Sequence, residues 1–280
     1  MIEVIQEKLD SMKESIELTD TNVGEFLIYK NDNIISNAIR LFGEYCHAEV
    51  DVMSTYLNEN SQYVDIGTNI GYHAVAIHKE TNCNVLGFEP NPKHFAVATF
   101  NSKEYDKIQL VNAAASNKRY KFKMKDFDET VSSNYGDIHK SDVGEIEVEA
   151  ITLDELALGR CHLMKIDVEG HEYETLQGAQ LTISKHRPII MYEAMEWDVW
   201  TKCYDFLDER KYKQYWVACR TKPIATTYKQ TEENPFGGSA VSNILCVPME
   251  KEQPDYLVPV RQHEGFMDCL NRYKKRRIIF

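Results

Sequence analysis

The sequence lacks the features of a secreted or membrane-spanning protein. It has no long apolar run and no Asn-x-Ser/Thr sequon, and its first ten positions include acidic residues, which argues against a signal peptide or a membrane span. It contains seven cysteines, an odd number, and no two of them have the Cys-x-x-Cys spacing of zinc and redox motifs. We therefore predict a cytoplasmic protein with buried, reduced thiols and without a metal site.

The sequence also lacks an excess of positive charge. It has 32 basic and 44 acidic residues, a formal net charge of −12, so its overall field does not favour nucleic acid. The basic run 272–277 is the local exception, and we interpret it as a solvated tail. With 280 residues, of which 43% are hydrophobic, the chain is long enough and apolar enough to bury a large core.

The N-terminal part has the pattern of a helical extension, predicted to cover residues 1–44. Apolar residues recur every three or four positions through residues 2–17, which predicts an amphipathic helix. A short strand at 24–30 and helices at 33–42 and 46–57 follow. The apolar face of the first helix can cap the core or pair with a second subunit, so a homo-oligomer stays open.

From residue 61 onward, apolar strands alternate with amphipathic helices. The predicted strands are 62–66, 84–88, 108–114, 161–166, 188–193, 212–219 and 241–247, and the predicted helices are 70–79, 92–103, 171–185 and 196–209. Strands joined by helices of this length make a parallel sheet with helices on both faces. The last two strands have no helix between them, so one of them is predicted to be antiparallel. The expected fold is a Rossmann-like α/β fold with a mostly parallel, seven-stranded sheet.

We assign residues 45–250 to one catalytic domain, followed by a C-terminal tail at 251–280. Within the domain, alternating runs on either side of a polar loop predict a β insertion at 119–152. The polar segment 220–240 is longer than most loops, which is typical of a binding lid or a disordered segment.

The stretch from Tyr63 to Tyr72 reads as a strand, a tight turn and the start of a helix, an arrangement that suits a small ligand. Gly67 can adopt backbone angles closed to other residues and bring the main chain close to a ligand. The helix that follows offers unpaired N–H groups. Asp65 at the strand end suits a cationic group and repels a phosphate. The turn therefore favours a ligand with a positive centre.

The next strand ends in Glu89, where an acidic side chain can accept both hydroxyls of a nucleoside ribose. A dinucleotide and S-adenosylmethionine both fit such a site. The dinucleotide fingerprint Gly-x-Gly-x-x-Gly requires a third glycine that is absent here, and Asp65 would repel the pyrophosphate. S-adenosylmethionine carries a sulfonium and an ammonium, so we predict it as the cofactor. A nicotinamide-dependent oxidoreductase and a non-catalytic scaffold that retains the fold are the alternatives.

A second motif, Lys165-Ile-Asp-Val-Glu-Gly-His-Glu172, places several ionisable groups just beyond a buried strand. Together with Val64–Gly71, Phe88-Glu89-Pro90 and Leu176-Gln-Gly-Ala179, it resembles the FkbM family of S-adenosylmethionine-dependent methyltransferases. The resemblance runs from about residue 45 to 250. The family usually has alanine at the position of Thr68.

Ligands of open parallel sheets lie at the carboxyl ends of the strands, which identifies the candidate donor-binding residues. They are Asp65, Gly67, Thr68, Asn69, Gly71, Glu89, Asn112, Ala113 and Asp167. The helical His73, His78 and His94 are interpreted as packing or surface residues, and Ser132-Ser133 is a weaker candidate for contact with adenine.

The acceptor is expected to be a hydroxyl of a sugar, glycan or small metabolite, which needs a general base beside the methyl group. His171 is the first candidate base, because imidazole titrates near neutral pH. Asp167 can act as the base, orient it, or recognise the donor, and Glu193 is expected to face the same cleft. Lys165 is expected to pair with a carboxylate. Trp197 and Trp200 are interpreted as core residues rather than as a platform on which the acceptor stacks.

Overall fold

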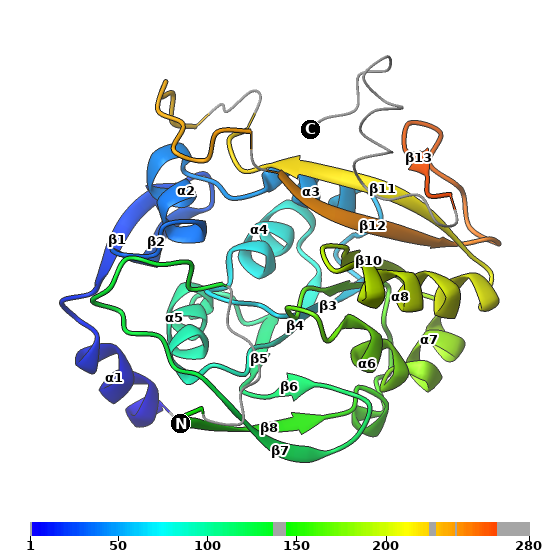
Figure 1. The fold of residues 1–280 in the computed structure, drawn as a ribbon, viewed down its shortest axis with the longest axis horizontal. Coiled ribbons are helices and arrows are strands. Elements are labelled where there is room, and N and C mark those ends of the chain that lie inside the picture. The colour runs from blue at the N-terminus through cyan, green and yellow to red at the C-terminus, as the bar shows by residue number, and fades with distance from the viewer. Residues whose placement is uncertain (1, 137–143, 224–227, 239, 262–280) are drawn as a thin grey trace.

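A computed structural model describes residues 2–136, 144–223, 228–238 and 240–261. Its centre is an eight-stranded sheet in the order β13-β11-β12-β10-β9-β3-β4-β5 (Figure 1). The strands are β3 Gln62–Ile66, β4 Asn84–Phe88, β5 Ile108–Val111, β9 Leu163–Ile166, β10 Ile189–Glu193, β11 Tyr212–Arg220, β12 Ala240–Pro248 and β13 Val258–Pro259. The five strands from β5 to β10 are parallel, and β12 is antiparallel to both of its neighbours.

The predicted Rossmann-like α/β fold with a mostly parallel sheet is confirmed. The seven predicted strands all take part, and the sheet has one more because the two-residue β13 pairs with β11 at the edge. β3 and β4 have the predicted bounds. The predicted strand at 108–114 instead divides into β5 and the short β6, Ala114–Ala115.

Helices cover both faces of the sheet. Neighbouring residues of a strand point to opposite faces, so each strand has apolar side chains on both sides for the helices to cover. Tyr63 belongs to the apolar cluster beneath α4 and α5, whereas Val64 belongs to the cluster beneath α6, α7 and α8 (Figure 1). The helices are α3 His47–Ser54, α4 Tyr72–Thr81, α5 Pro92–Ser102, α6 Glu172–Gln177, α7 Gln180–His186 and α8 Trp197–Glu209. Within the described ranges, every helix is too short or too polar to cross a bilayer.

The N-terminal segment differs from its prediction. Helix α1, Ile2–Ser11, ends earlier than expected, and Ile16 begins strand β1, Ile16–Thr21, which forms an antiparallel hairpin with β2, Gly24–Tyr29. The helical spacing that includes Ile16 is fortuitous, because β-branched residues such as Ile16 and Thr19 suit a strand. Leu9 and Met12 are buried in the core, so the first helix caps its own chain. Helix α2, Ile35–Phe42, follows.

The segment predicted as a β insertion forms a separate three-stranded sheet with order β6-β8-β7 (Figure 1). Strands β7, Tyr120–Met124, and β8, Ile146–Ile151, are antiparallel, and a short 3-10 helix, Asp154–Leu156, follows. The isolated bridge between Asp32 and Ser133 ties the insertion to the N-terminal segment. Parts of the insertion loop and of the predicted 220–240 lid, and the whole basic run 272–277, lie outside the described residues.

The predicted helix 171–185 is interrupted at Gly178, which separates α6 from α7. A Cβ atom at Gly178 would lie 1.9 Å from the carbonyl oxygen of Ser116. We expect Gly178→Ala to destabilise the protein by about 1–3 kcal/mol, as over-packed sites do. Urea unfolding measures the effect, and Gly159→Ala, where nothing lies within 4 Å of the new Cβ, is the control. Equal stability of the two variants would contradict the close contact.

Candidate active site

A cavity of about 490 Å³ opens at the carboxyl ends of the central strands. Its lining includes Gly67 after β3, Glu89 after β4, Asp167 after β9, and Glu193 at the end of β10. Pockets for small molecules and cofactors commonly have volumes of about 300–1,000 Å³. The cavity therefore has the size and the position expected of a ligand site in this type of sheet.

The turn after β3 is shaped by residues in left-handed backbone conformations. Gly67 has a φ of 88°, and a Cβ there would lie 1.8 Å from the carbonyl oxygen of Asp167. The backbone N–H groups of Gly67 and Thr68 both donate to the carbonyl of Phe88 at 3.0 Å. Only glycine fits at position 67, because this turn must pass directly against the loop that carries Asp167.

Glu89 is a buried carboxyl group at one end of the cavity, with 5% of its surface exposed. Its two oxygens accept hydrogen bonds from the backbone N–H groups of Asn69 and Asn91, each at 2.8 Å. Burial raises the pKa of Glu89 to about 8. A carboxylate has more acceptor positions than these two bonds use, so both oxygens can still accept hydroxyl donors.

Two polar atoms of cavity-lining residues near Glu89 make no hydrogen bond in the described part of the chain. They are Nδ2 of Asn91 and Nδ1 of His94, and both side chains are at least 97% buried. His94 stacks on Phe127 and bonds the Tyr135 carbonyl at 2.8 Å, so the packing role predicted for it is only part of its environment. Buried polar groups normally have partners, so this end of the cavity is suited to a polar ring such as a nucleobase.

Lys165 lies in the middle of the sheet with 2% of its surface exposed. Its Nζ bonds Asp167 Oδ2 at 2.6 Å. Burial alone would lower the Lys165 pKa, but Asp167, Glu49 and Asp65 outweigh it and raise that pKa. Lys165 therefore pairs with a carboxylate, as expected from the sequence.

Three of the predicted donor-binding residues, Asp65, Gly71 and Asn112, do not border the cavity. Asp65 is 1% exposed, and its Oδ1 accepts a hydrogen bond from the Tyr63 hydroxyl at 2.8 Å. Asn112 uses its side-chain amide to donate to the carbonyls of Glu89 and Pro90. Asp65 influences the site through the buried Lys165, and Asn112 holds the loop after β4.

The three predicted catalytic residues, His171, Asp167 and Glu193, all line the same cavity. Asp167, Glu169 and Glu193 each have a carboxylate oxygen within 4.8 Å of the other two. Burial raises the pKa of Glu193 to about 10, with Asp167 and Glu169 adding to the effect. Glu193 is therefore protonated at neutral pH. This acidic end of the cavity attracts cations, and oxygen groups this close can also hold a divalent metal.

Glu172, the last residue of the second motif, has a structural task. It is 2% exposed, and its Oε1 accepts hydrogen bonds from the backbone N–H groups of Val168 and Gly170. These bonds hold the loop in which Glu169 and Gly170 adopt positive φ angles of 51° and 90°. Glu172 fixes the loop that presents Asp167 and His171 to the cavity.

The cavity also has walls that the strand-end reasoning missed. Ile34 and Tyr45 come from the N-terminal segment, and Tyr120, Phe122 and Met124 come from β7. The alternation of these three β7 residues signals one apolar strand face, but not which surface that face covers. Ser132-Ser133, the weaker candidate for adenine contact, does not contribute to the lining.

The sequence pattern of the FkbM methyltransferase domain matches residues 65–215, which is more than half of the chain. The chain belongs to the FkbM methyltransferase family. The predicted family is confirmed, with S-adenosylmethionine as its methyl donor, and the nicotinamide alternative has no support. The matched region contains all four motifs except Val64 at the start of the first.

Individual relatives give narrower matches. Hexuronic acid methyltransferase AglP of Haloferax volcanii is 33% identical over 150 residues, which cover 46% of this chain and 56% of AglP. The FkbM methyltransferase structure from Methylobacillus flagellatus has a TM-score of 0.45 and 15% identity, over 68% of this chain and 44% of that one. The tRNA (uracil-54, C5)-methyltransferase of Pyrococcus abyssi, in complex with S-adenosyl-L-homocysteine, has a TM-score of 0.43 and 12% identity, over 83% and 44% of the two chains.

The raised pKa of Glu193 has a consequence for stability. Folding shifts this pKa from about 4.5 in the unfolded chain to about 10 in the folded protein. The contribution of protonated Glu193 to the free energy of unfolding is therefore full below the unfolded pKa and is lost as the pH rises through the folded pKa. We expect the wild type to lose stability relative to Glu193→Gln between about pH 6 and pH 9, measured by urea unfolding at each pH. Glu196→Gln is the control. Parallel pH profiles for the wild type and Glu193→Gln would contradict the assignment.

Proposed function

We propose that this chain is an S-adenosylmethionine-dependent O-methyltransferase that acts on a hydroxyl of a sugar, glycan or small metabolite. The main support is one cavity that is lined both by a buried carboxyl group, Glu89, and by the acidic group Asp167, Glu169 and Glu193 with His171. The similarity to a hexuronic acid methyltransferase favours a carbohydrate acceptor. The match to this relative covers less than half of the chain. The proposed acceptor therefore rests on the chemistry of the cavity residues as well as on the similarity.

The residues of the cavity fit the donor. In this proposal Glu89 accepts the ribose hydroxyls, and Asn91 and His94 meet the base with the polar atoms that the protein leaves unpaired. Gly67 lets the main chain approach closely, and Thr68, Asn69 and Ala113 complete this wall. The acidic end, with Asp167, suits ammonium and sulfonium charges. Bound S-adenosylmethionine supplies an electrophilic methyl group.

The acceptor side is assigned to the opposite wall, near His171 and the start of α8. Met195 and Glu196 line the cavity there, and Trp197 follows with 47% of its surface exposed. Trp200 is 3% exposed, as the core interpretation expects, but Trp197 is not a core residue. An exposed indole beside a polar cavity offers a flat apolar surface on which a sugar ring can stack.

His171 is the residue best suited to take the acceptor proton. Glu193 is protonated at neutral pH and has no free site for another proton. Asp167 forms a 2.6 Å ion pair with Lys165, so one of its oxygens is already occupied by the ammonium group. His171 lies at the N-terminus of α6, half-buried in the cavity wall, where the loop held by Glu172 fixes its backbone.

Donor binding is the direct test of the proposal. We expect Glu89→Ala to weaken S-adenosylhomocysteine binding by about 10- to 100-fold, because it removes two hydrogen bonds to the ribose, each worth about 0.5–1.5 kcal/mol. Isothermal titration calorimetry measures the change. Glu104→Ala, at an exposed turn after α5, is the matched control.

Glu89 also bonds two backbone groups, so the fold of the variant must be checked. A thermal unfolding curve gives this check, and Glu89→Asp keeps the carboxyl group while shortening its reach. Folded Glu89→Ala with wild-type affinity would overturn the ribose assignment. A wild-type chain that binds no S-adenosylhomocysteine at high micromolar concentration would overturn the proposed activity and leave a non-catalytic scaffold.

The proposed base gives a second test, once labelled donor and a mixture of oligosaccharides and metabolites have identified an acceptor. His171→Ala should lower kcat by about 100- to 10,000-fold, the usual contribution of a general base, without changing donor affinity. It should also remove the acidic limb of the pH–rate profile. His186→Ala, on α7 and outside the cavity, is the control. Normal turnover by His171→Ala and loss of turnover in Asp167→Asn would transfer the role to Asp167.

A further inference from the structure

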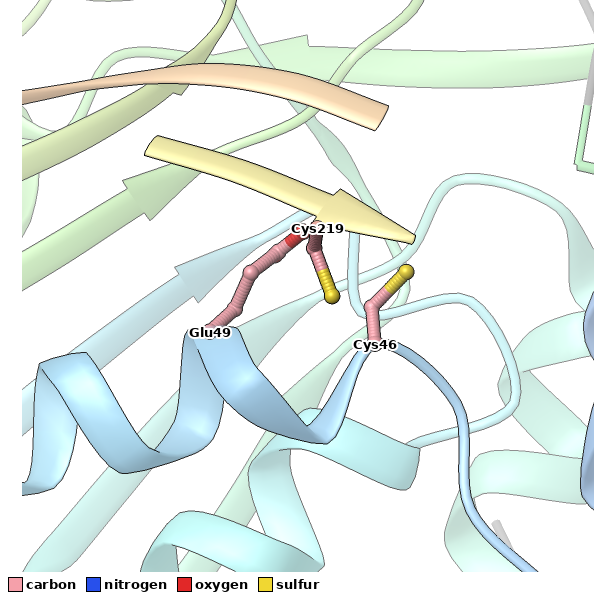
Figure 2. A group of neighbouring side chains, drawn as sticks. All are labelled: Cys46, Glu49 and Cys219. Carbon is pink, nitrogen blue, oxygen red and sulfur yellow. The ribbon is translucent and has the colours of Figure 1, made fainter. Parts of the chain in front are cut away.

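A second group of ligating side chains lies beside the cavity, where α3 faces the end of β11. Cys46 precedes α3, Glu49 is in its first turn, and Cys219 is the second-last residue of β11. Figure 2 shows both sulfur atoms in the space between the helix and the strand. One ligand atom from each residue lies within 4.8 Å of the other two, and no side chain is more than 4% exposed.

His73, from the first turn of α4, brings a fourth ligand atom to this group. Its Nε2 lies 3.8 Å from Glu49 Oε2 and has no hydrogen-bond partner in the described part of the chain. A buried imidazole nitrogen that has no partner and lies beside a carboxylate oxygen is available to coordinate a metal ion.

The surrounding groups orient and balance this cluster. Asn243 donates from Nδ2 to Glu49 Oε1 at 2.8 Å, as second-layer groups do for ligating carboxylates. Two thiolates, one carboxylate and a divalent ion have a net charge of −1. The buried Lys165 lies close enough to interact electrostatically with Cys46 and Glu49, so its positive charge can offset that net charge.

The donor set distinguishes between metals. Two sulfurs, one nitrogen and one oxygen are ligands of tetrahedral zinc, whereas magnesium and calcium prefer oxygen alone. Ligands of zinc lie about 2.0–2.3 Å from the ion, and so about 3.5 Å from one another. The ligand atoms of Cys46, Glu49 and Cys219 lie within 4.8 Å of one another, and His73 Nε2 lies 3.8 Å from Glu49 Oε2, so the four side chains must draw closer together to bind zinc.

We propose that Cys46, Glu49, His73 and Cys219 form a structural zinc site that joins α3 and α4 to the end of β11. On binding, each thiol releases its proton to solvent, and the two thiolates, the carboxylate and the imidazole coordinate Zn²⁺. Tyr45, His73 and Thr221 line the cavity, so the site braces the cavity wall from behind. This assignment does not depend on the proposed methyl transfer.

Metal titration of the full, reduced and chelator-treated chain tests the proposal. We expect one equivalent of Zn²⁺ to bind, with a rise in Tm. Co²⁺ should give thiolate-to-cobalt charge-transfer absorption and the strong visible bands of a four-coordinate site. Cys219→Ser should lose the charge-transfer absorption and the Tm rise, and Asn243→Ala should weaken zinc binding by about 10- to 100-fold.

Cys203→Ser, which removes a buried thiol beneath α8, is the matched control and should bind both metals as the wild type does. Circular dichroism of the metal-free variants separates loss of the site from loss of the fold, and Glu49→Gln serves as a second variant if Cys219→Ser unfolds. Absence of cobalt–thiolate absorption from the wild type would overturn the proposal. Equal metal binding by Cys219→Ser and Cys203→Ser would overturn it too, as would a reduced wild-type chain that binds neither metal.

Discussion

The burial of one positive charge in the central sheet organises the chemistry of this protein. Lys165 occupies the middle of β9, between β3 and β10, where its ammonium group has almost no access to water. A buried ammonium is tolerated only when carboxylates surround it, and here Asp65, Glu49 and Asp167 do so. These three residues come from β3, α3 and the loop after β9. The same charge therefore fixes the base of the cavity and lies beside the cysteine cluster.

Much of the fold follows from local pattern. β3 and β4 have the predicted bounds because an apolar run between turn-forming residues leaves little choice of register. The motif residues also gather at one cavity, since the carboxyl ends of parallel strands share an edge. The N-terminal hairpin was harder to predict, because Ile16 satisfies helical spacing and strand propensity equally. Pairing with Tyr29 decides between them, and a single segment cannot show this.

What the sequence could not show is which charged groups meet. Asp65 and Glu172 belong to the two motifs, yet one is buried against Tyr63 and the other holds a loop. No spacing motif marks the proposed zinc ligands, because the two cysteines are far apart along the chain. Cys46 and Cys219 are brought together by the sheet across most of the catalytic domain. Such contacts depend on strand order, which periodicity does not encode.

The acidic group Asp167, Glu169 and Glu193 couples the charge of a bound ligand to the protonation of Glu193. Lys165 is already shared by its carboxylate neighbours, so it cannot fully compensate Glu193, and this residue keeps its proton at neutral pH. A cationic ligand placed among Asp167, Glu169 and Glu193 stabilises the ionised form of Glu193 and lowers its pKa. By linkage, binding of such a ligand releases a proton and tightens as the pH rises. A neutral product bound in the same place has no such advantage. In the proposed donor site, the electrostatics of the cavity thus favour a positively charged ligand over one that lacks this charge.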